Sequence, residues 1–142
     1  NDIQFRDSCN LSAVNSINWV RVMAQVVYYF YGALKLCSPE DPISFSVPTG
    51  NFGNVFAGYG AKRMGLNIEK LIIGSNRNDI LYRFFNDGRM LSATVEPTIS
   101  PSMDIQISSN FERLLFELYG RDGKITQTMM KSFSKKVIFP NG

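Results

Sequence analysis

The stretch that decides the fold is ISFSVPTGNFGNVFAGYGAKRMG, which occupies residues 43–65. Residues 43–47 favour an extended strand, and Pro48 predicts the end of that strand because proline cannot donate to a sheet ladder. Residues 49–54 then place two glycines and two asparagines within six positions. A helical pattern follows over residues 55–65. The sequence therefore predicts a strand, a glycine-rich turn and a helix in direct succession.

A turn of this kind can bind an anion, because the N–H groups of a first helical turn lack intrahelical acceptors and the helix dipole is positive there. Gly50 and Gly53 allow a close approach of the backbone, with positive φ if the turn requires it. The side chains of Asn51 and Asn54 can donate as well, and Asn54 can cap the helix. Spacing alone leaves a turn that binds nothing equally open. The stretch lacks both the Gly-Lys-Ser/Thr ending of a P-loop and the G-x-G-x-x-G dinucleotide pattern.

The flanking segments predict an α/β fold with a parallel sheet and flanking helices. A second strand is expected at Lys70–Gly74, and a strand–helix–strand order with short connections implies a parallel pair. A helix over residues 17–34, capped by Asn15 or Ser16, is apolar nearly all round, which predicts burial on several sides and cover for one sheet face. A buried arginine needs an anionic partner, so Arg21 is expected in an ion pair rather than on a substrate phosphate.

The second half of the chain predicts short helices around a long loop. Asn78 or Asp79 is expected to cap a helix over residues 80–85, and the polar residues 75–79 would lie beside the glycine-rich turn. Residues 89–107 are irregular. Ser109 and Glu112 have the spacing of a capping box, which predicts a helix that ends at Gly120. A last helix is expected over residues 125–133.

Composition excludes several classes of function. The 142 residues are 44% apolar, enough for one packed domain, and contain no histidine, so no metal site is predicted. Cys9 and Cys37 are expected to be buried free thiols. Residues 121–142 carry a local charge of +4, interpreted as a solvated helix face rather than a nucleic-acid site. The apolar helix is interrupted by polar residues, so no membrane span is predicted.

Four motifs in order carry a resemblance to a known family. PTGNFGN at residues 48–54 resembles the loop that holds the cofactor phosphate in threonine synthases, which are pyridoxal-phosphate enzymes of fold type II, like the tryptophan synthase β-subunit. NSINWVR at 15–21, SNRNDIL at 75–81 and PSMDIQISSNFERLLFE at 101–117 resemble further segments of the same family. The resemblance extends over roughly residues 9–120.

The resemblance implies a cytoplasmic enzyme of threonine biosynthesis. Such an enzyme converts O-phospho-L-homoserine and water into L-threonine and phosphate, with pyridoxal 5′-phosphate as the electron sink. The full-length protein would act as a monomer or homodimer on this small-molecule substrate. The residues implied to hold the cofactor phosphate are Gly50, Asn51, Phe52, Gly53 and Asn54, with Phe52 contributing its backbone N–H.

The resemblance also implies that residues 1–142 are an internal portion of the catalytic domain, incomplete at both ends. No lysine here stands in a context that matches the family's Schiff-base lysine, so no catalytic residue is assigned and the chain alone is expected to be inactive. Two alternatives stay open. One is another fold type II lyase, such as a threonine deaminase or cysteine synthase, and the other is a non-catalytic α/β module.

Overall fold

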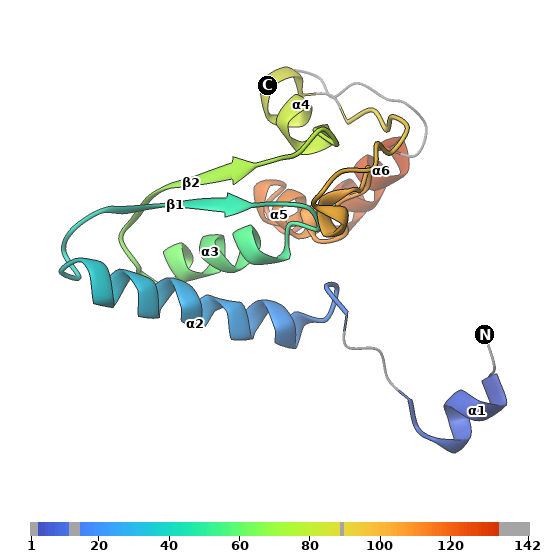
Figure 1. The fold of residues 1–142 in the computed structure, drawn as a ribbon, viewed down its shortest axis with the longest axis horizontal. Coiled ribbons are helices and arrows are strands. Elements are labelled where there is room, and N and C mark those ends of the chain that lie inside the picture. Colours follow the sequence, from blue (N-terminus) through green and yellow to red (C-terminus); the bar gives the residue numbers. More distant parts are fainter. Residues whose placement is uncertain (1–2, 12–14, 89, 134–142) are drawn as a thin grey trace.

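The computed structural model describes residues 3–11, 15–88 and 90–133. Figure 1 shows how its helices and strands are arranged. In order they are α1 (Ile3–Ser8), α2 (Trp19–Leu36), β1 (Ile43–Pro48), α3 (Gly53–Arg63), β2 (Ile68–Gly74), α4 (Ile80–Asp87), a 3₁₀ turn (Pro101–Met103), α5 (Phe111–Leu118) and α6 (Gly123–Phe133).

The described residues form one sheet of two parallel strands, β1 and β2. Phe45 pairs with Leu71 and Val47 with Ile73, so both strands run toward the same edge. The strand β2 begins two residues before the expected position. The predicted α/β fold with a parallel sheet and flanking helices is confirmed.

Helices α3 and α2 lie on the same side of the sheet, with α3 next to the strands (Figure 1). The close packing depends on Gly58, because a Cβ atom there would lie 2.7 Å from the ring of Tyr29 in α2 and 2.8 Å from Leu71 in β2. The Tyr29 ring also packs edge-on against Phe45 of β1, with centroids 4.8 Å apart. The first long helix therefore helps to cover one face of the sheet, as expected.

Helix α2 is less buried than its sequence predicts. Only three of its side chains are buried, namely Val22, Tyr29 and Ala33. Val26 and Phe30 are half-buried. The remaining large apolar side chains are more than 45% exposed, among them Val20, Val27, Tyr28, Tyr31 and Leu34. The predicted burial of α2 on several sides is therefore wrong for the described chain, because the neighbouring elements cover only one face of the helix.

The helix caps also differ from those predicted. Asn18, rather than Asn15 or Ser16, caps α2 by accepting a hydrogen bond from the Val20 N–H at 2.9 Å. Asp79 is at the N-cap position of α4, but its carboxylate pairs with Arg83 at 2.8 Å instead of capping the backbone. At α2, Asn18 accepts the hydrogen bond that the predicted cap would have accepted, and at α4, Arg83 engages the carboxylate that would have capped the backbone.

The two cysteines are free, as predicted, but Cys9 is exposed and Cys37 is half-buried, so the expected burial is wrong. In the described ranges, no helix combines the length and the apolar character that crossing a membrane requires. The cations Arg121, Lys124 and Lys131 are exposed on or next to α6, whereas Lys135 and Lys136 lie outside the described residues.

Candidate functional site

The loop Pro48–Asn54 leaves the carboxyl end of β1 and enters α3 two residues earlier than predicted. The N-cap residue is Phe52, and Asn54 lies inside the helix, so the prediction that Asn54 caps the helix is wrong. Phe52 adopts the left-handed conformation, with φ 62° and ψ −1°, and its carbonyl accepts from the Phe56 N–H at 3.0 Å. The positive φ of this turn therefore belongs to an aromatic residue and not to either glycine.

The Phe52 side chain holds this unusual backbone in place. Its ring is 4% exposed and packs edge-on against Phe111 of α5, with centroids 5.2 Å apart. It also stacks on Phe85 of α4 at 6.5 Å. A left-handed non-glycine residue costs free energy and persists where its surroundings over-determine it. The aromatic cluster therefore fixes the direction in which the loop enters α3.

A cavity of about 150 Å³ lies over the start of α3. All five residues predicted to hold a phosphate line it, as do their neighbours Pro48, Thr49 and Val55. Ser16, Arg21 and Gln25, from the segment before α2 and from α2 itself, line it as well. Within the described part of the chain, no protein oxygen accepts a hydrogen bond from the backbone N–H groups of Asn51, Phe52 or Gly53. These donors and the helix dipole make the cavity suitable for an anion.

Arg21 gives this cavity its positive charge. The ion pair expected for it is absent, because no carboxylate in the described ranges lies within 4.0 Å of its guanidinium, and the side chain is exposed. It stands on the first turn of α2 and lines the same cavity as the loop with its free N–H groups. An arginine can bind a phosphate through two parallel hydrogen bonds.

The side chain of Asn54 joins α3 to α2. Its Oδ1 accepts from the Tyr29 hydroxyl at 2.7 Å, and its Nδ2 donates to Gln25 Oε1 at 3.1 Å. The Tyr29 hydroxyl also donates to the Asn54 carbonyl at 2.9 Å. Burial raises the pKa of Tyr29 to about 12. Asn54 therefore lines the cavity while its amide is already engaged by two side chains.

The backbone carbonyls of the loop are bonded to residues 108–110. Ser108 Oγ donates to the Gly50 carbonyl at 2.8 Å. Asn110 donates to the Asn51 carbonyl from its backbone N–H at 3.1 Å and from Nδ2 at 2.9 Å. The capping box predicted from Ser109 and Glu112 is wrong, because Asn110 is the N-cap residue and Ser109 Oγ bonds Asn51 Oδ1 instead, at 3.3 Å. The same motif therefore supports the loop.

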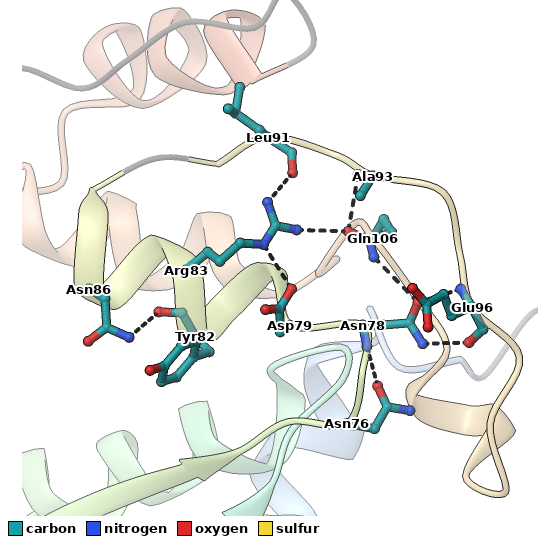
Figure 2. A network of polar contacts seen from close by, with 10 residues as sticks. All are labelled: Asn76, Asn78, Asp79, Tyr82, Arg83, Asn86, Leu91, Ala93, Glu96 and Gln106. Atoms are coloured by element: carbon teal, nitrogen blue, oxygen red, sulfur yellow. Dashed lines mark hydrogen bonds and ion pairs between the residues drawn. The ribbon is translucent and has the colours of Figure 1, made fainter.

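A polar network connects this segment to the end of β2 (Figure 2). Asn78 makes two hydrogen bonds with the backbone of Glu96, at 2.8 and 2.9 Å, and accepts from Gln106 Nε2 at 3.3 Å. Arg83 reaches Gln106 Oε1 at 3.4 Å and the Leu91 carbonyl at 2.8 Å. The long loop is therefore pinned to the carboxyl end of β2, next to the segment that supports the cavity.

Asp104 is the charged centre of a neighbouring part of this network. The hydroxyl and backbone N–H of Thr98 donate to its carboxylate, each at 2.7 Å. The amides of Asn76 and Asn78 donate to it as well, at 2.7 and 3.1 Å. These donors, Thr98 first, lower the pKa of the Asp104 carboxyl. The polar residues after β2 therefore hold the long loop, and none of them lines the cavity.

Three of the residues that build the site were not predicted, namely Gln25, Ser108 and Asn110. The signal for Ser108 and Asn110 was their place in the motif at residues 101–117, which the sequence linked to the loop only by resemblance. Larger cavities lie elsewhere among the described residues. The one of about 500 Å³ is lined by two carboxylates, Glu112 and Glu117, and the one of about 410 Å³ mostly by apolar side chains, so both offer less to an anion.

Comparison with known proteins gives the site its context. No protein-family model matches the chain. A threonine synthase from Pseudomonas aeruginosa is 55% identical over 132 residues, which are 93% of this chain and 28% of that protein. The crystal structure of a PLP-bound threonine synthase from Brucella melitensis superposes with a TM-score of 0.91 at 56% identity, over 100% of this chain and 31% of that one.

The structure of the yeast threonine synthase superposes with a TM-score of 0.82 at 44% identity, over 92% of this chain and 28% of that one. The chain thus spans less than a third of the length of the proteins it matches. Sequence and fold agree along nearly the whole chain, and both comparisons return the family that the four motifs resemble. The chain therefore belongs to the threonine synthase family, of whose members it spans one segment.

Proposed function

We propose that the cavity at the start of α3 binds the phosphate group of pyridoxal 5′-phosphate, and that the protein carrying this chain is a threonine synthase. The observation that supports this is the lining of the cavity, which both Arg21 and the loop with its free backbone N–H groups border. One relative of high similarity is described as PLP-bound.

The residues present fit a phosphate better than a whole cofactor. Pockets for drug-sized ligands measure about 300–1,000 Å³, whereas this cavity measures about 150 Å³. Its donors are backbone N–H groups of Asn51, Phe52 and Gly53, together with the guanidinium of Arg21. Gly50 allows the loop to lie close to its supporting segment. Asn54 lines the cavity with a side chain that is already bonded to Tyr29 and Gln25. The phosphate would thus be a fixed handle that orients the rest of the cofactor.

The chemistry of such an enzyme is supplied by the cofactor, which acts as an electron sink for the amino-acid substrate. This chain would contribute the binding and orientation of the phosphate, since Arg21 and the loop with its free N–H groups line one cavity. No lysine lines the cavity within the described residues. We therefore propose that residues 1–142 are an internal portion of the catalytic domain and are inactive alone. Within this proposal the full-length enzyme is cytoplasmic and acts as a monomer or homodimer.

Product analysis tests the proposal. The full-length protein, supplied with pyridoxal 5′-phosphate and O-phospho-L-homoserine, should release L-threonine and phosphate in equal amounts. A different fold type II lyase would leave O-phospho-L-homoserine unchanged and convert threonine or O-acetylserine instead. A non-catalytic module would bind no cofactor and form no product. Either result would contradict the proposed function.

A further inference from the structure

We propose that Ser108 and Asn110 are positioning residues for the phosphate site, because they turn the N–H groups of the loop toward the cavity. The proposal rests on the proposed function, in which this cavity takes the cofactor phosphate. Neither residue lines the cavity, so neither would touch the ligand. Their effect would reach the ligand through the carbonyl groups of Gly50 and Asn51.

Both residues are buried and both donate to the loop. Ser108 is 5% exposed and its hydroxyl lies 2.8 Å from the Gly50 carbonyl oxygen. Asn110 is fully buried and donates twice to the Asn51 carbonyl oxygen, at 3.1 Å from its backbone and 2.9 Å from its side chain. Two successive carbonyls of the loop are therefore held on the side of residues 108–110.

The geometry of the peptide bond transmits this constraint. A trans peptide unit is planar, so its C=O and the following N–H point in opposite directions, and the described chain contains no cis peptide bond. When the Gly50 carbonyl points at Ser108, the Asn51 N–H points away from it. When the Asn51 carbonyl points at Asn110, the Phe52 N–H likewise points away from Asn110. The two N–H groups are thus directed toward the side of the loop on which the cavity lies.

Asn110 also fixes the other wall of the cavity. Its Nδ2 donates to the Ser16 carbonyl at 2.8 Å, and its Oδ1 accepts from Arg113 Nε at 3.0 Å. Arg113 in turn donates to the Ile17 carbonyl at 2.7 Å. These bonds hold the residues that precede α2, the helix that carries Arg21. The buried side-chain amide of Asn110 therefore helps to position both the N–H groups of the loop and the start of the helix that carries Arg21.

The fit between the loop and its support is close. A Cβ atom on Gly50 would lie 3.2 Å from the Ser102 carbonyl oxygen, and one on Gly53 would lie 3.4 Å from Asn110 Nδ2. The supporting segment is pinned in turn by Asn78 and Gln106, as Figure 2 shows. The loop therefore has little room to rotate its peptide units while these hydrogen bonds are intact.

The test compares the affinity for pyridoxal 5′-phosphate with that for pyridoxal, which lacks the phosphate, in the full-length protein. Ser108→Ala should reduce the preference for the phosphorylated form about fivefold, and Asn110→Leu about tenfold, with little effect on pyridoxal. Ser108→Thr, which keeps the hydroxyl, should retain the preference. The matched control is Thr126→Val in α6. Thr126 is also a buried residue, 9% exposed, whose hydroxyl donates to a backbone carbonyl at 2.8 Å.

The outcomes separate this proposal from the proposed function. If the unaltered protein prefers the phosphorylated form and Ser108→Ala keeps that preference, the positioning role is wrong and the phosphate site stands. If Ser108→Ala weakens both ligands equally, as Thr126→Val would through general destabilisation, the positioning role is also wrong. If the unaltered protein shows no preference, the phosphate site itself is wrong. If Asn110→Leu does not fold, the comparison of Ser108→Ala with Ser108→Thr decides the question.

Discussion

Asn110 donates two hydrogen bonds to the carbonyl oxygen of Asn51, one from its backbone at 3.1 Å and one from its side chain at 2.9 Å. The same side chain reaches the Ser16 carbonyl at 2.8 Å. Three segments that are far apart in the sequence therefore meet at one buried amide. The cavity over α3 therefore depends on tertiary contacts and is not formed by the loop alone.

Removal of the Arg21 charge is expected to weaken phosphate binding. Arg21→Gln should reduce the affinity of the full-length protein for pyridoxal 5′-phosphate by about 1.5–3 kcal/mol, the usual worth of a hydrogen bond to a charged group. The affinity for pyridoxal should hardly change, as measured by equilibrium titration. Lys35→Gln removes a cation from the other end of α2 and serves as the control. Equal losses in both variants would mean that only net charge matters.

Packing between α3 and its neighbours is expected to depend on Gly58. Gly58→Ala should lower the free energy of unfolding by about 1–3 kcal/mol, because the new methyl group overlaps Tyr29 and Leu71. Gly60→Ala is the matched control on the same helix, since its Cβ would meet Val26 at an ordinary 3.7 Å. Alanine there should be neutral or stabilising by up to about 1 kcal/mol. Denaturant unfolding measures both, and equal effects would refute the close approach.

Tyr29 is expected to make stability fall at high pH. Its pKa is about 12 in the folded protein and 10.0 in an unperturbed tyrosine, because burial disfavours the phenolate. The stability that this group contributes is therefore complete below pH 10 and is lost as the pH rises toward 12, by about 3 kcal/mol.

Titration of phenolate absorbance in the full-length protein and in Tyr29→Phe isolates this group. The difference between the two curves should show one tyrosine with a midpoint near pH 12. Tyr28→Phe removes an exposed neighbour and is the control. A Tyr29 midpoint at the ordinary value would contradict the burial of its hydroxyl against Asn54.

Asp104 is expected to make the long loop sensitive to acid. Hydrogen bonds from Thr98, Asn76 and Asn78 hold its pKa below the ordinary value of 3.8. Its contribution to stability is therefore present above that value and is lost as the pH falls through the lower, folded pKa. The free energy of unfolding should differ between the unaltered protein and Asp104→Asn at neutral pH, and the difference should shrink in acid. Asp87→Asn, an exposed carboxylate of α4, is the control, and a difference independent of pH would be the contrary result.

The sequence predicted the central unit well because that unit is local. Strand β1, the glycine-rich turn, α3 and β2 follow from residues 43–74 through propensity, proline and glycine signals. The parallel pairing followed from the short connections. Four of the loop residues, Gly50, Asn51, Gly53 and Asn54, were found in the same way, and Phe52 was implied by the resemblance. The structure gathers all five around one cavity.

What the sequence could not predict depends on distant partners. Nothing local indicates that Asn110 bonds Asn51 across 59 positions, or that Phe52 takes a left-handed conformation against Phe111. The capping pattern at Ser109 was misleading, because its hydroxyl has a tertiary acceptor that competes with the helix end. The burial of α2 was overestimated because periodicity reports which faces are apolar and not what covers them.

The central claim is that the start of α3 holds the cofactor phosphate, and an NMR titration of the full-length protein with selectively labelled glycine amides tests it most directly. Pyridoxal 5′-phosphate should shift the amide signals of Gly50 and Gly53, while Gly58 and Gly60, in the same helix but away from the cavity lining, should move less. Pyridoxal at the same concentration should leave all four nearly unchanged. Equal shifts with both compounds, or shifts elsewhere with Gly50 and Gly53 silent, would contradict the phosphate site.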